Sequence, residues 1–298
     1  MTADPDVTVV VASTDRYSDC WQAFFRLFGR FWSDCPYSVV LLTETKTFES
    51  DHVAIRCHHA GAQFAGPQHW SDCLLSLVRE ISTPYILYLQ EDYFLKGRVN
   101  QQVIAEFVRI MSKNRLAHVR LAECDQGRAA YQNSGYAPQI WSIEPHASYL
   151  VSLQAGLWST AALGGLLING ESAADFEKFG TVRARQRGIA MHCENLDRFD
   201  RIGEQIVPYT PTGIVNGRWN LSAVVPLLAD NGIFIDFSAR GFIEGIPQSP
   251  YVVLRRKARA FFVARAPWVF TLLYRRASPR ALLDNIASPA RNTERNHL

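Results

Sequence analysis

The sequence predicts an α/β protein with a mostly parallel sheet flanked by helices. Short apolar runs have the length and composition of buried strands, and amphipathic segments of helical period lie between them. With 298 residues, 48% of them hydrophobic, the chain can bury a full core without disulfides or a structural metal. The predicted strands are residues 7–13, 38–44, 52–59 and 85–89, and the first two predicted helices are residues 17–32 and 70–81.

The six cysteines are widely spaced and form no CxxC pair, so we expect reduced thiols rather than a zinc site or a redox centre. Residues 1–6 are short and acidic and lead directly into the first predicted strand, without the basic start and cleavage site of a signal peptide. No stretch approaches the roughly 20 apolar residues that cross a bilayer. We therefore expect a cytoplasmic protein without a transmembrane segment.

Charge separates a body from a tail. Residues 251–298 contain ten Lys or Arg and two acidic residues, which leaves 21 basic and 26 acidic residues, a net charge of −5, on residues 1–250. Leu254, Ala258 and Phe261 fall on one helical face, which predicts a basic amphipathic helical tail that binds an anionic membrane surface. Packing of this tail on the body is the alternative. Nucleic-acid binding is not expected, because the body is acidic and lacks RNP-type or zinc-finger patterns.

Polar residues follow three of the predicted strands, where ligands of an α/β sheet bind. They are Thr14, Asp15 and Arg16 after the first strand, Glu44 after the second, and Gln90, Glu91 and Asp92 after the fourth. Neither GxGxxG nor GxxxxGK[ST] occurs, so the two common phosphate-binding loops are absent from the sequence. A bound nucleotide would therefore need another source of positive charge, such as a divalent cation held by carboxylates.

Glu91 and Asp92 are the best candidates for holding that cation, Mn²⁺ or Mg²⁺. They end an apolar run at residues 85–89, and two adjacent acids buried there are costly unless a cation pairs with them. The alternative is a helix cap or a solvated turn.

At these residues the sequence resembles the GT-A glycosyltransferases, which use nucleotide-sugar donors and carry an acidic metal motif, usually Asp-x-Asp, after the fourth strand of a Rossmann-like half. The likeness covers about residues 7–220. Residues 7–16 look like the first strand and the loop around the nucleoside, and residues 89–95 look like the acidic motif. Gln90 stands where the motif has its first acid, which bears on metal dependence.

The resemblance implies a catalytic domain at residues 1–250, with a nucleotide-binding half at 1–123, an acceptor half at 124–250, and a separate tail at 251–298. It also implies that the residues after the first two strands, together with Gln90, contact the donor. We expect a nucleotide-sugar as co-substrate.

The acceptor half is predicted to hold the catalytic base. Residues 147–153 look like a strand and residues 154–168 like a helix, before a segment similar to bacterial surface-polysaccharide transferases, in which an acid at a helix start is the base. The similarity implies Asp175 or Glu177, with Glu171 as a third candidate. A carboxylate in hydrogen-bond reach can remove the proton of an acceptor hydroxyl as it attacks the anomeric carbon. The alternative is that these are first-turn acids favoured by the helix dipole.

A leaving diphosphate needs positive charge nearby. The candidates for this role are Arg183, Arg185, Arg187 and His192, and spacing at i, i+2 and i+4 cannot place all three arginines on one helix face. For His192 a core position is the expected alternative. Arg218 lies in residues 216–220, predicted to be a loop that returns to the site, where it would bind sugar or phosphate or else pack the loop.

Together these observations predict an inverting glycosyltransferase. It would transfer a sugar to a hydroxyl of a glycan acceptor, polyprenyl- or lipid-linked, in bacterial surface-polysaccharide biosynthesis at the inner face of the cytoplasmic membrane. One alternative is a nucleotidyltransferase, although the Gly-rich basic loop expected after its first strand is missing from the sequence. Another is a catalytically inactive GT-A-like scaffold or binding module at the membrane surface.

Overall fold

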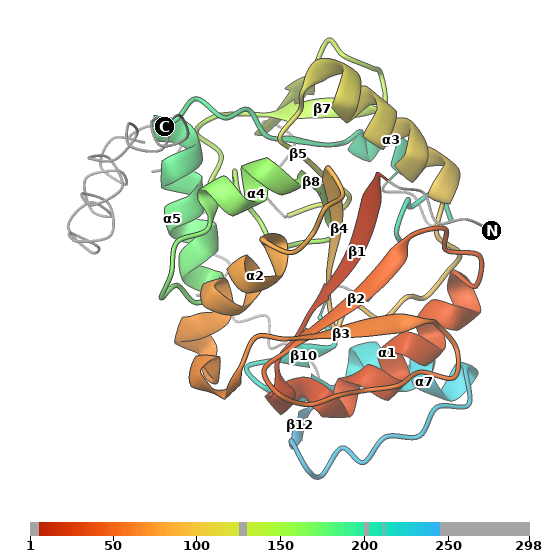
Figure 1. Cartoon of the computed structure of the whole chain (residues 1–298). Coiled ribbons are helices and arrows are strands. Elements are labelled where there is room, and N and C mark those ends of the chain that lie inside the picture. Colours follow the sequence, from red (N-terminus) through yellow and green to blue (C-terminus); the bar gives the residue numbers. More distant parts are fainter. Residues whose placement is uncertain (1–5, 125–129, 200–202, 211, 245–298) are drawn as a thin grey trace.

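The computed structural model describes residues 6–124, 130–199, 203–210 and 212–244. A nine-stranded sheet crosses the molecule, helices cover both of its faces, and a small three-stranded sheet lies near one end of α1 (Figure 1). The tail at 251–298, with the expectations of an amphipathic helix and a membrane contact made for it, lies outside the described residues.

The strand order of the large sheet is β3-β2-β1-β4-β8-β5-β9-β7-β6. The first four strands are parallel, and β8 joins them to the rest by antiparallel pairing with both β4 and β5. The strands of this sheet are β1 (Val7–Ala12), β2 (Ser38–Thr43), β3 (Ile55–His59), β4 (Tyr85–Gln90), β5 (His118–Arg120), β6 (Tyr131–Asn133), β7 (Ile140–Ile143), β8 (Gly156–Ser159) and β9 (His192–Glu194). The small sheet contains β10 (Ile214–Val215), β11 (Arg218–Asn220) and β12 (Phe242–Ile243).

The core lies in two layers, one on each face of the large sheet. Strand β1 is buried along its whole length because Val9 and Val11 point into one layer and Val10 and Ala12 into the other. The first layer contains apolar side chains of α1 (Ser18–Phe31), α3 (Gln101–Asn114) and α7 (Leu221–Asp230). The second contains those of α2 (Trp70–Val78), α4 (Thr160–Leu166) and α5 (Ala173–Gln186). Shorter helices are η1 (Asp15–Tyr17), η2 (Ala62–Phe64), η3 (Pro67–His69) and α6 (Leu196–Phe199).

The α/β class and the four parallel strands of the first half are confirmed, whereas the second half differs from the expectation. Residues 147–153 form no named strand, and the start of the predicted helix at 154–168 is instead strand β8, followed by α4. The sheet is therefore mixed in its second half. Gly156 permits this pairing, because a Cβ at that position would lie 2.9 Å from Nε2 of His118 on β5.

All six cysteines are free, as expected from their spacing. Within the part of the chain that the structure describes, no helix has the length and apolar character needed to cross a bilayer.

Candidate active site

The carboxyl ends of β1, β2 and β4 meet at one edge of the sheet. Ala12, the last residue of β1, is paired with Leu42 on β2 and with Gln90 on β4. The polar residues that follow these three strands therefore lie together, as the sequence predicted.

Asp15 and Glu44 hold the first two loops to each other. The backbone N–H of Asp15 donates to Glu44 Oε2, and the N–H of Glu44 donates to Asp15 Oδ1 over 3.1 Å. The Asp15 carboxylate also accepts from Thr45 N and Oγ1 and from Lys46 N. Burial raises the pKa of Asp15, but these hydrogen bonds outweigh burial and the net pKa is lowered. Both carboxylates thus hold the loops after β1 and β2 to each other.

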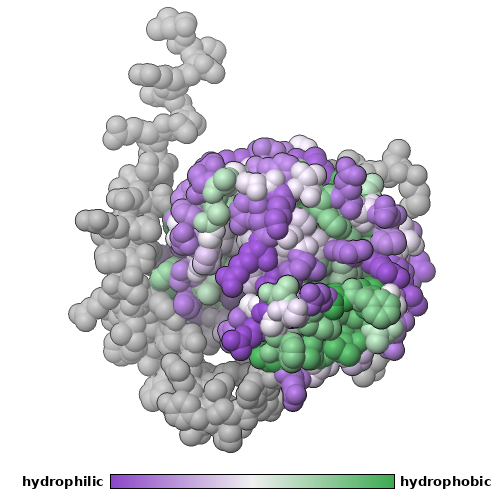
Figure 2. All heavy atoms as spheres, turned by 90° about the horizontal axis from the view of Figure 1, so that it is seen from below, coloured by the Kyte–Doolittle hydropathy of each residue, from purple (hydrophilic) through white to green (hydrophobic). Residues whose placement is uncertain are grey.

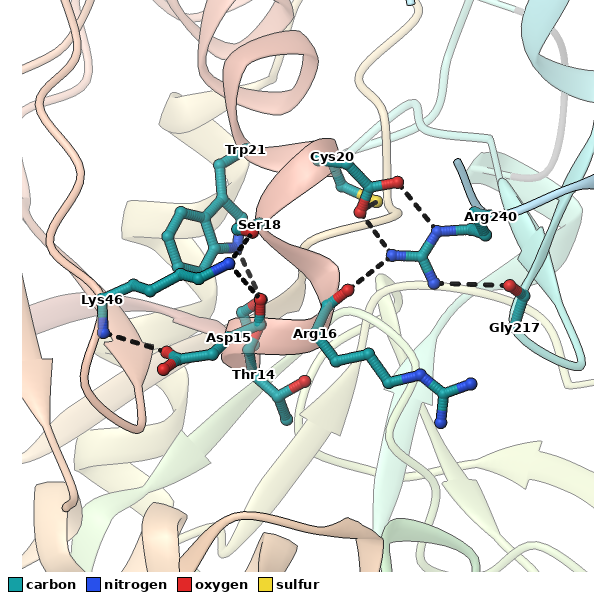
Figure 3. Close-up of polar contacts among 11 residues, drawn as sticks. Thr14, Asp15, Arg16, Ser18, Cys20, Trp21, Lys46, Gly217 and Arg240 are labelled. Carbon is teal, nitrogen blue, oxygen red and sulfur yellow. Dashed lines mark hydrogen bonds and ion pairs between the residues drawn. The ribbon is translucent and has the colours of Figure 1, made fainter. Parts of the chain in front are cut away.

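Arg16 and Thr14 extend this loop with groups that remain free. The side chain of Arg16 is exposed and points away from the Asp15 network in Figure 3, and its guanidinium has no partner among the described residues. Its Nη2 lies 3.4 Å from the position that a Cβ of Gly217 would take. Thr14 is half-buried and its hydroxyl makes no cap hydrogen bond with η1. Arg16 is therefore a cation available to a ligand at this edge.

Arg240 is a site residue that the sequence analysis missed. Its side chain is only 7% exposed, and its guanidinium forms a bidentate ion pair with Asp19 and lies 4.4 Å above the ring of Tyr17. It also donates to the carbonyl oxygen of Arg16 over 2.8 Å (Figure 3). Burial raises the pKa of Glu91, and the charge of Arg240 partly opposes that rise. No local motif marks Arg240, because its partner Asp19 is 221 residues away in sequence.

The carboxylates of Glu91 and Asp92, at the end of β4, are buried with too few hydrogen bonds and positive charges to offset the loss of water. Burial and the charge of Asp92 raise the pKa of Glu91 well above its usual value. Burial also raises the pKa of Asp92 to about 6, although Ile214 N donates to its Oδ2 over 3.2 Å. Two adjacent acids in this state are the donor set that a divalent cation fits, because the cation removes their repulsion and their desolvation penalty. Gln90, which precedes them, donates from Nε2 to the hydroxyl of Tyr88 over 3.1 Å.

A short hairpin packs against this acid pair, and residues 216–220, which were expected to form a loop, form its turn and strand β11. Strands β10 and β11 are joined by a turn at Asn216 and Gly217, both with positive φ. The approach is close at Gly213, where a Cβ would lie 2.6 Å from the ring of Phe94 and 2.9 Å from the carbonyl oxygen of Asp92. Arg218 is exposed on β11 and its guanidinium has no partner among the described residues, whereas Trp219 is buried and stacks on Phe94.

Glu177 on α5 has the environment of a general base. Its Oε1 accepts from Leu153 N over 2.8 Å and from Ser152 Oγ over 3.2 Å. Among the described residues, Oε2 has no hydrogen-bond partner. Burial raises the pKa of this carboxyl, although these two hydrogen bonds lower it. One oxygen is therefore held in place while the other remains available to accept a proton.

Leu153 links Glu177 to the acid pair. The hydroxyl of Tyr93, the residue that follows Asp92, donates to the Leu153 carbonyl oxygen over 3.0 Å, and the Leu153 N–H donates to Glu177. Tyr93 also stacks on Tyr209 with ring centroids 4.6 Å apart. The sequence analysis missed Tyr93 and Leu153, although a tyrosine directly after an acidic pair was visible in the sequence.

Asp175 has a different environment although it is only two residues from Glu177. It accepts from the hydroxyl of Ser172 over 2.7 Å, its N–H donates to Ser172 Oγ, and its carboxylate lies 3.8 Å from Lys178 Nζ. This is the N-terminal cap of α5, and it agrees with the alternative that the sequence analysis left open for this acid.

The arginines of α5 are engaged with other parts of the fold. Arg183 forms a buried bidentate ion pair with Glu171, at 2.6 and 2.7 Å, so its charge is already neutralised. Arg185 donates to the carbonyl oxygens of Pro145 and Ala147, and Arg187 to that of Gly165. The expectation that Arg183 contacts a leaving diphosphate is therefore corrected by its ion pair. Arg16 and Arg218 are the better placed cations.

The described residues contain no group of three or more His, Cys, Asp or Glu side chains that converge on a metal position. Glu91 and Asp92 could supply the one or two carboxylates that, together with phosphate oxygens of a substrate, commonly hold Mg²⁺. His192, considered as a further metal ligand, is buried on β9 beside the ring of Tyr136, which is a core position.

Comparison with known proteins gives structural neighbours only. No protein-family model and no curated protein sequence matches the chain. Solved structures that resemble it include Staphylococcus aureus TarS 1–349, at 13% identity over 63% of this chain and 57% of that chain, with a TM-score of 0.43. The match thus spans little more than half of the TarS chain.

Two further neighbours match more of their own length. Glucosyl-3-phosphoglycerate synthase from Mycobacterium tuberculosis, in complex with phosphoglyceric acid, is 11% identical over 77% of this chain and 81% of that chain, with a TM-score of 0.39. Mannosyltransferase PcManGT from Pyrobaculum calidifontis, in complex with GDP-Man and Mn²⁺, is 13% identical over 96% and 82%, with a TM-score of 0.43. All three TM-scores lie below 0.5, so these likenesses carry no argument about what this chain does.

Proposed function

We propose that the chain is a nucleotide-sugar-dependent glycosyltransferase that transfers a sugar to a hydroxyl of a glycan acceptor with inversion at the anomeric carbon. The observation that carries this proposal is the joint placement of two kinds of carboxylate. The poorly compensated pair Glu91 and Asp92 ends β4, and the half-buried Glu177, with one unoccupied oxygen, is tied to the same loop through Leu153.

The donor side is formed by the edge that β1, β2 and β4 share. The clasp between Asp15 and Glu44 fixes the two loops that would enclose the nucleoside. Glu91 and Asp92 would hold a divalent cation, which when bound supplies positive charge to the diphosphate. The guanidinium groups of Arg16 and Arg218 have no partner among the described residues and would stabilise the negative charge that develops on the leaving nucleoside diphosphate.

The acceptor side is formed by Glu177. Its free Oε2 would take the proton of the acceptor hydroxyl while the hydroxyl oxygen attacks the anomeric carbon and the bond from that carbon to the diphosphate oxygen breaks. A raised pKa favours this role, because a base works best when its pKa lies near the working pH. Attack opposite to the leaving group inverts the configuration.

The acceptor is proposed to be a lipid-linked glycan of a bacterial surface polysaccharide. Support comes from the sequence of residues 251–298, whose excess of Arg and Lys and regular apolar positions suit an anionic membrane surface at which such an acceptor would be found. This part of the proposal is separable from sugar transfer itself.

The test is ligand-induced stabilisation of the full chain by UDP-, GDP-, dTDP- and CMP-linked sugars, each with and without Mn²⁺. A ligand that binds only the folded state raises the free energy of unfolding by RT ln(1 + [L]/Kd), so one donor class should raise the melting temperature, and more so with the metal. Transfer is then measured with that donor by release of the nucleoside diphosphate.

The controls are Asp92→Asn and the capping variant Asp175→Asn. The first should remove the metal-dependent part of the shift, and the second should leave it unchanged. Absence of stabilisation by every donor would contradict the proposal and favour the inactive scaffold. Stabilisation by a free nucleoside triphosphate, with release of pyrophosphate, would identify the nucleotidyltransferase instead.

A further inference from the structure

Helix α7 and the turn after it present apolar side chains to solvent. Ser222 and Asp230 are the only polar residues of α7, although just one side of the helix is buried, at Val224 and Leu228. Val225 on the outer side is 41% exposed. A helix with so few polar residues is normally covered on all sides.

The most exposed apolar side chain of this region is that of Phe234, which is 96% exposed, while its neighbour Ile233 is anchored in the core. Pro226 adds to the exposed apolar area. We call Val225, Pro226 and Phe234 the α7 surface. Figure 2 shows a broad apolar area on the face seen from below, the side on which Figure 1 places α7, β10 and β12.

Positive charge borders this surface. The exposed Arg26 of α1 reaches to within 3.9 Å of where a Cβ of Gly232 would lie, and Arg30 is exposed one turn further along α1. Asp230 and Asp236 are exposed nearby and offset this charge locally. The surplus of positive charge therefore has to come from the chain that follows.

The following chain begins close to the α7 surface. The last described strand, β12, pairs with β11, which leads directly into α7. Residues 245–250 can span at most about 20 Å, so the cationic stretch 251–298, with ten basic and two acidic residues, starts within reach of α7. The sequence therefore allows a strongly basic segment to begin within reach of an apolar surface.

We propose that the α7 surface docks on an anionic lipid bilayer, with Phe234 inserted at the boundary between headgroups and acyl chains. Exposed apolar side chains flanked by basic residues bind such interfaces through burial of apolar area and attraction to anionic lipid. The alternative of a second copy is disfavoured by size. Three exposed apolar side chains fall short of the roughly 800 Å² per partner that a stable protein interface buries.

Docking in this orientation would bring the membrane to the candidate active site. Arg218 lies three residues before the start of α7, and the hairpin that carries it contacts Asp92. A sugar acceptor anchored in the bilayer would thus approach from the side of the hairpin. This consequence rests on the proposed function, whereas the docking itself does not.

The test is flotation of the full chain with vesicles of phosphatidylglycerol and phosphatidylcholine, compared with phosphatidylcholine alone. The double variant Val225→Ser, Phe234→Ser should bind the anionic vesicles at least about tenfold more weakly. Because both side chains are exposed, the melting temperature should be retained. Tyr136→Ser, which removes an exposed aromatic between β6 and β7, is the matched control and should bind normally.

Hydrogen exchange on the full chain supplies a second readout. Amides of residues 221–237 should exchange more slowly when anionic vesicles are added. Equal binding by the double variant, or failure of the unmodified chain to bind anionic vesicles, would overturn the proposal. A dimer that the double substitution dissociates would assign the surface to a second copy. If the amides of residues 221–237 already exchange equally slowly without vesicles, the occupant of the α7 surface would be residues 245–298.

None of these measurements needs a sugar donor. Donor-induced stabilisation is measured without vesicles, so a failure of membrane docking and a failure of sugar-transferase activity are observed separately.

Discussion

Two aspartates lie at the same edge of the sheet and differ in how many hydrogen bonds their carboxylates accept. Asp15 accepts four hydrogen bonds from the loop after β2, and its pKa is lowered. Asp92 receives one from Ile214 as well as its own N–H, and its pKa is raised to about 6. The same residue type at neighbouring strand ends thus stabilises the fold in one case and is left for a ligand in the other.

Two acids on α5 differ in the same way, one being part of a helix cap and the other a candidate base. Asp175 shares its hydrogen bonds with Ser172 and lies near Lys178. Glu177, two residues later, is held by one oxygen only. The hydrogen bonds that a carboxylate makes, more than its position along the chain, distinguish structural acids from candidate catalytic acids.

The largest effect on sugar transfer is expected from a substitution on α5. Glu177→Gln should lower kcat for sugar transfer by about 10²- to 10⁴-fold, because the amide cannot accept the acceptor proton, while donor binding is retained. In the unmodified chain, kcat/KM should rise with pH through the raised pKa of Glu177, since only the deprotonated carboxylate is active.

Asp175→Asn is the matched control for this prediction, as an acid-to-amide change on the same helix. It should cost about 1 kcal/mol of stability through the weakened cap and leave kcat unchanged. Equal loss of transfer in both variants would remove the distinction between the two acids.

The next effect is on stability at the clasp. Asp15→Ala should lower the free energy of unfolding by about 2–3 kcal/mol at pH 7, because several backbone N–H groups lose a charged acceptor. The stabilisation by Asp15 is present above its unfolded pKa of 3.8 and is lost as pH falls through the lower folded pKa. Urea unfolding at pH 7 and at pH 3 measures both parts, and a variant as stable as the parent at pH 7 would contradict the structural role.

The contribution of Asp92 to stability should change with pH in the direction opposite to that of Asp15. Asp92 has a raised pKa in the folded state, so its contribution to stability falls as pH rises from 3.8 to about 6 and is unfavourable above that. Asp92→Asn should therefore raise stability at pH 7 by about 1–2 kcal/mol in the absence of metal. Thermal unfolding with and without Mn²⁺ tests this, because the variant should also lose stabilisation by the ion. Destabilisation without metal would show that the pair is well compensated.

The smallest effect on kcat is expected at Tyr93, which links the acid pair to Glu177 through Leu153. Tyr93→Phe removes the hydrogen bond to Leu153 and keeps the stacking on Tyr209. We expect kcat to fall about three- to tenfold with an unchanged Kd for the donor, because the support of Glu177 loosens while the acid pair is untouched. Steady-state kinetics with donor titration separates the two quantities. A change in donor Kd alone would place Tyr93 in donor binding instead.

Much of the first half of the fold was predictable because its signals are local. Strands β1, β2 and β4 are continuous apolar runs, and α1 repeats its aromatic residues at helical spacing. Strand β8 was missed because it is only four residues long and its strand conformation depends on pairing with β4 and β5, which lie far away in sequence. Gly156 was its only local signal.

The candidate site was predictable in its residue types and less so in their roles. The resemblance to bacterial surface-polysaccharide transferases pointed to Asp175 or Glu177 without distinguishing them, and only their contacts separate the two acids. Arg183 looked available for phosphate because its partner Glu171 is 12 residues away in sequence, before the start of α5. Arg240 was not predictable, because it meets Asp19 only after the chain has returned across the whole domain.

Gly213 limits which changes the hairpin would accept in protein engineering. A larger residue there would force the β10–β11 hairpin off Phe94 and Asp92, and Asn216 and Gly217 are restricted by their positive φ. Arg218 has no such restriction, because its side chain is exposed and its guanidinium forms no hydrogen bond or ion pair with the described residues. A library varied at position 218, with 213, 216 and 217 kept, would therefore search for new donor specificities on an unchanged scaffold.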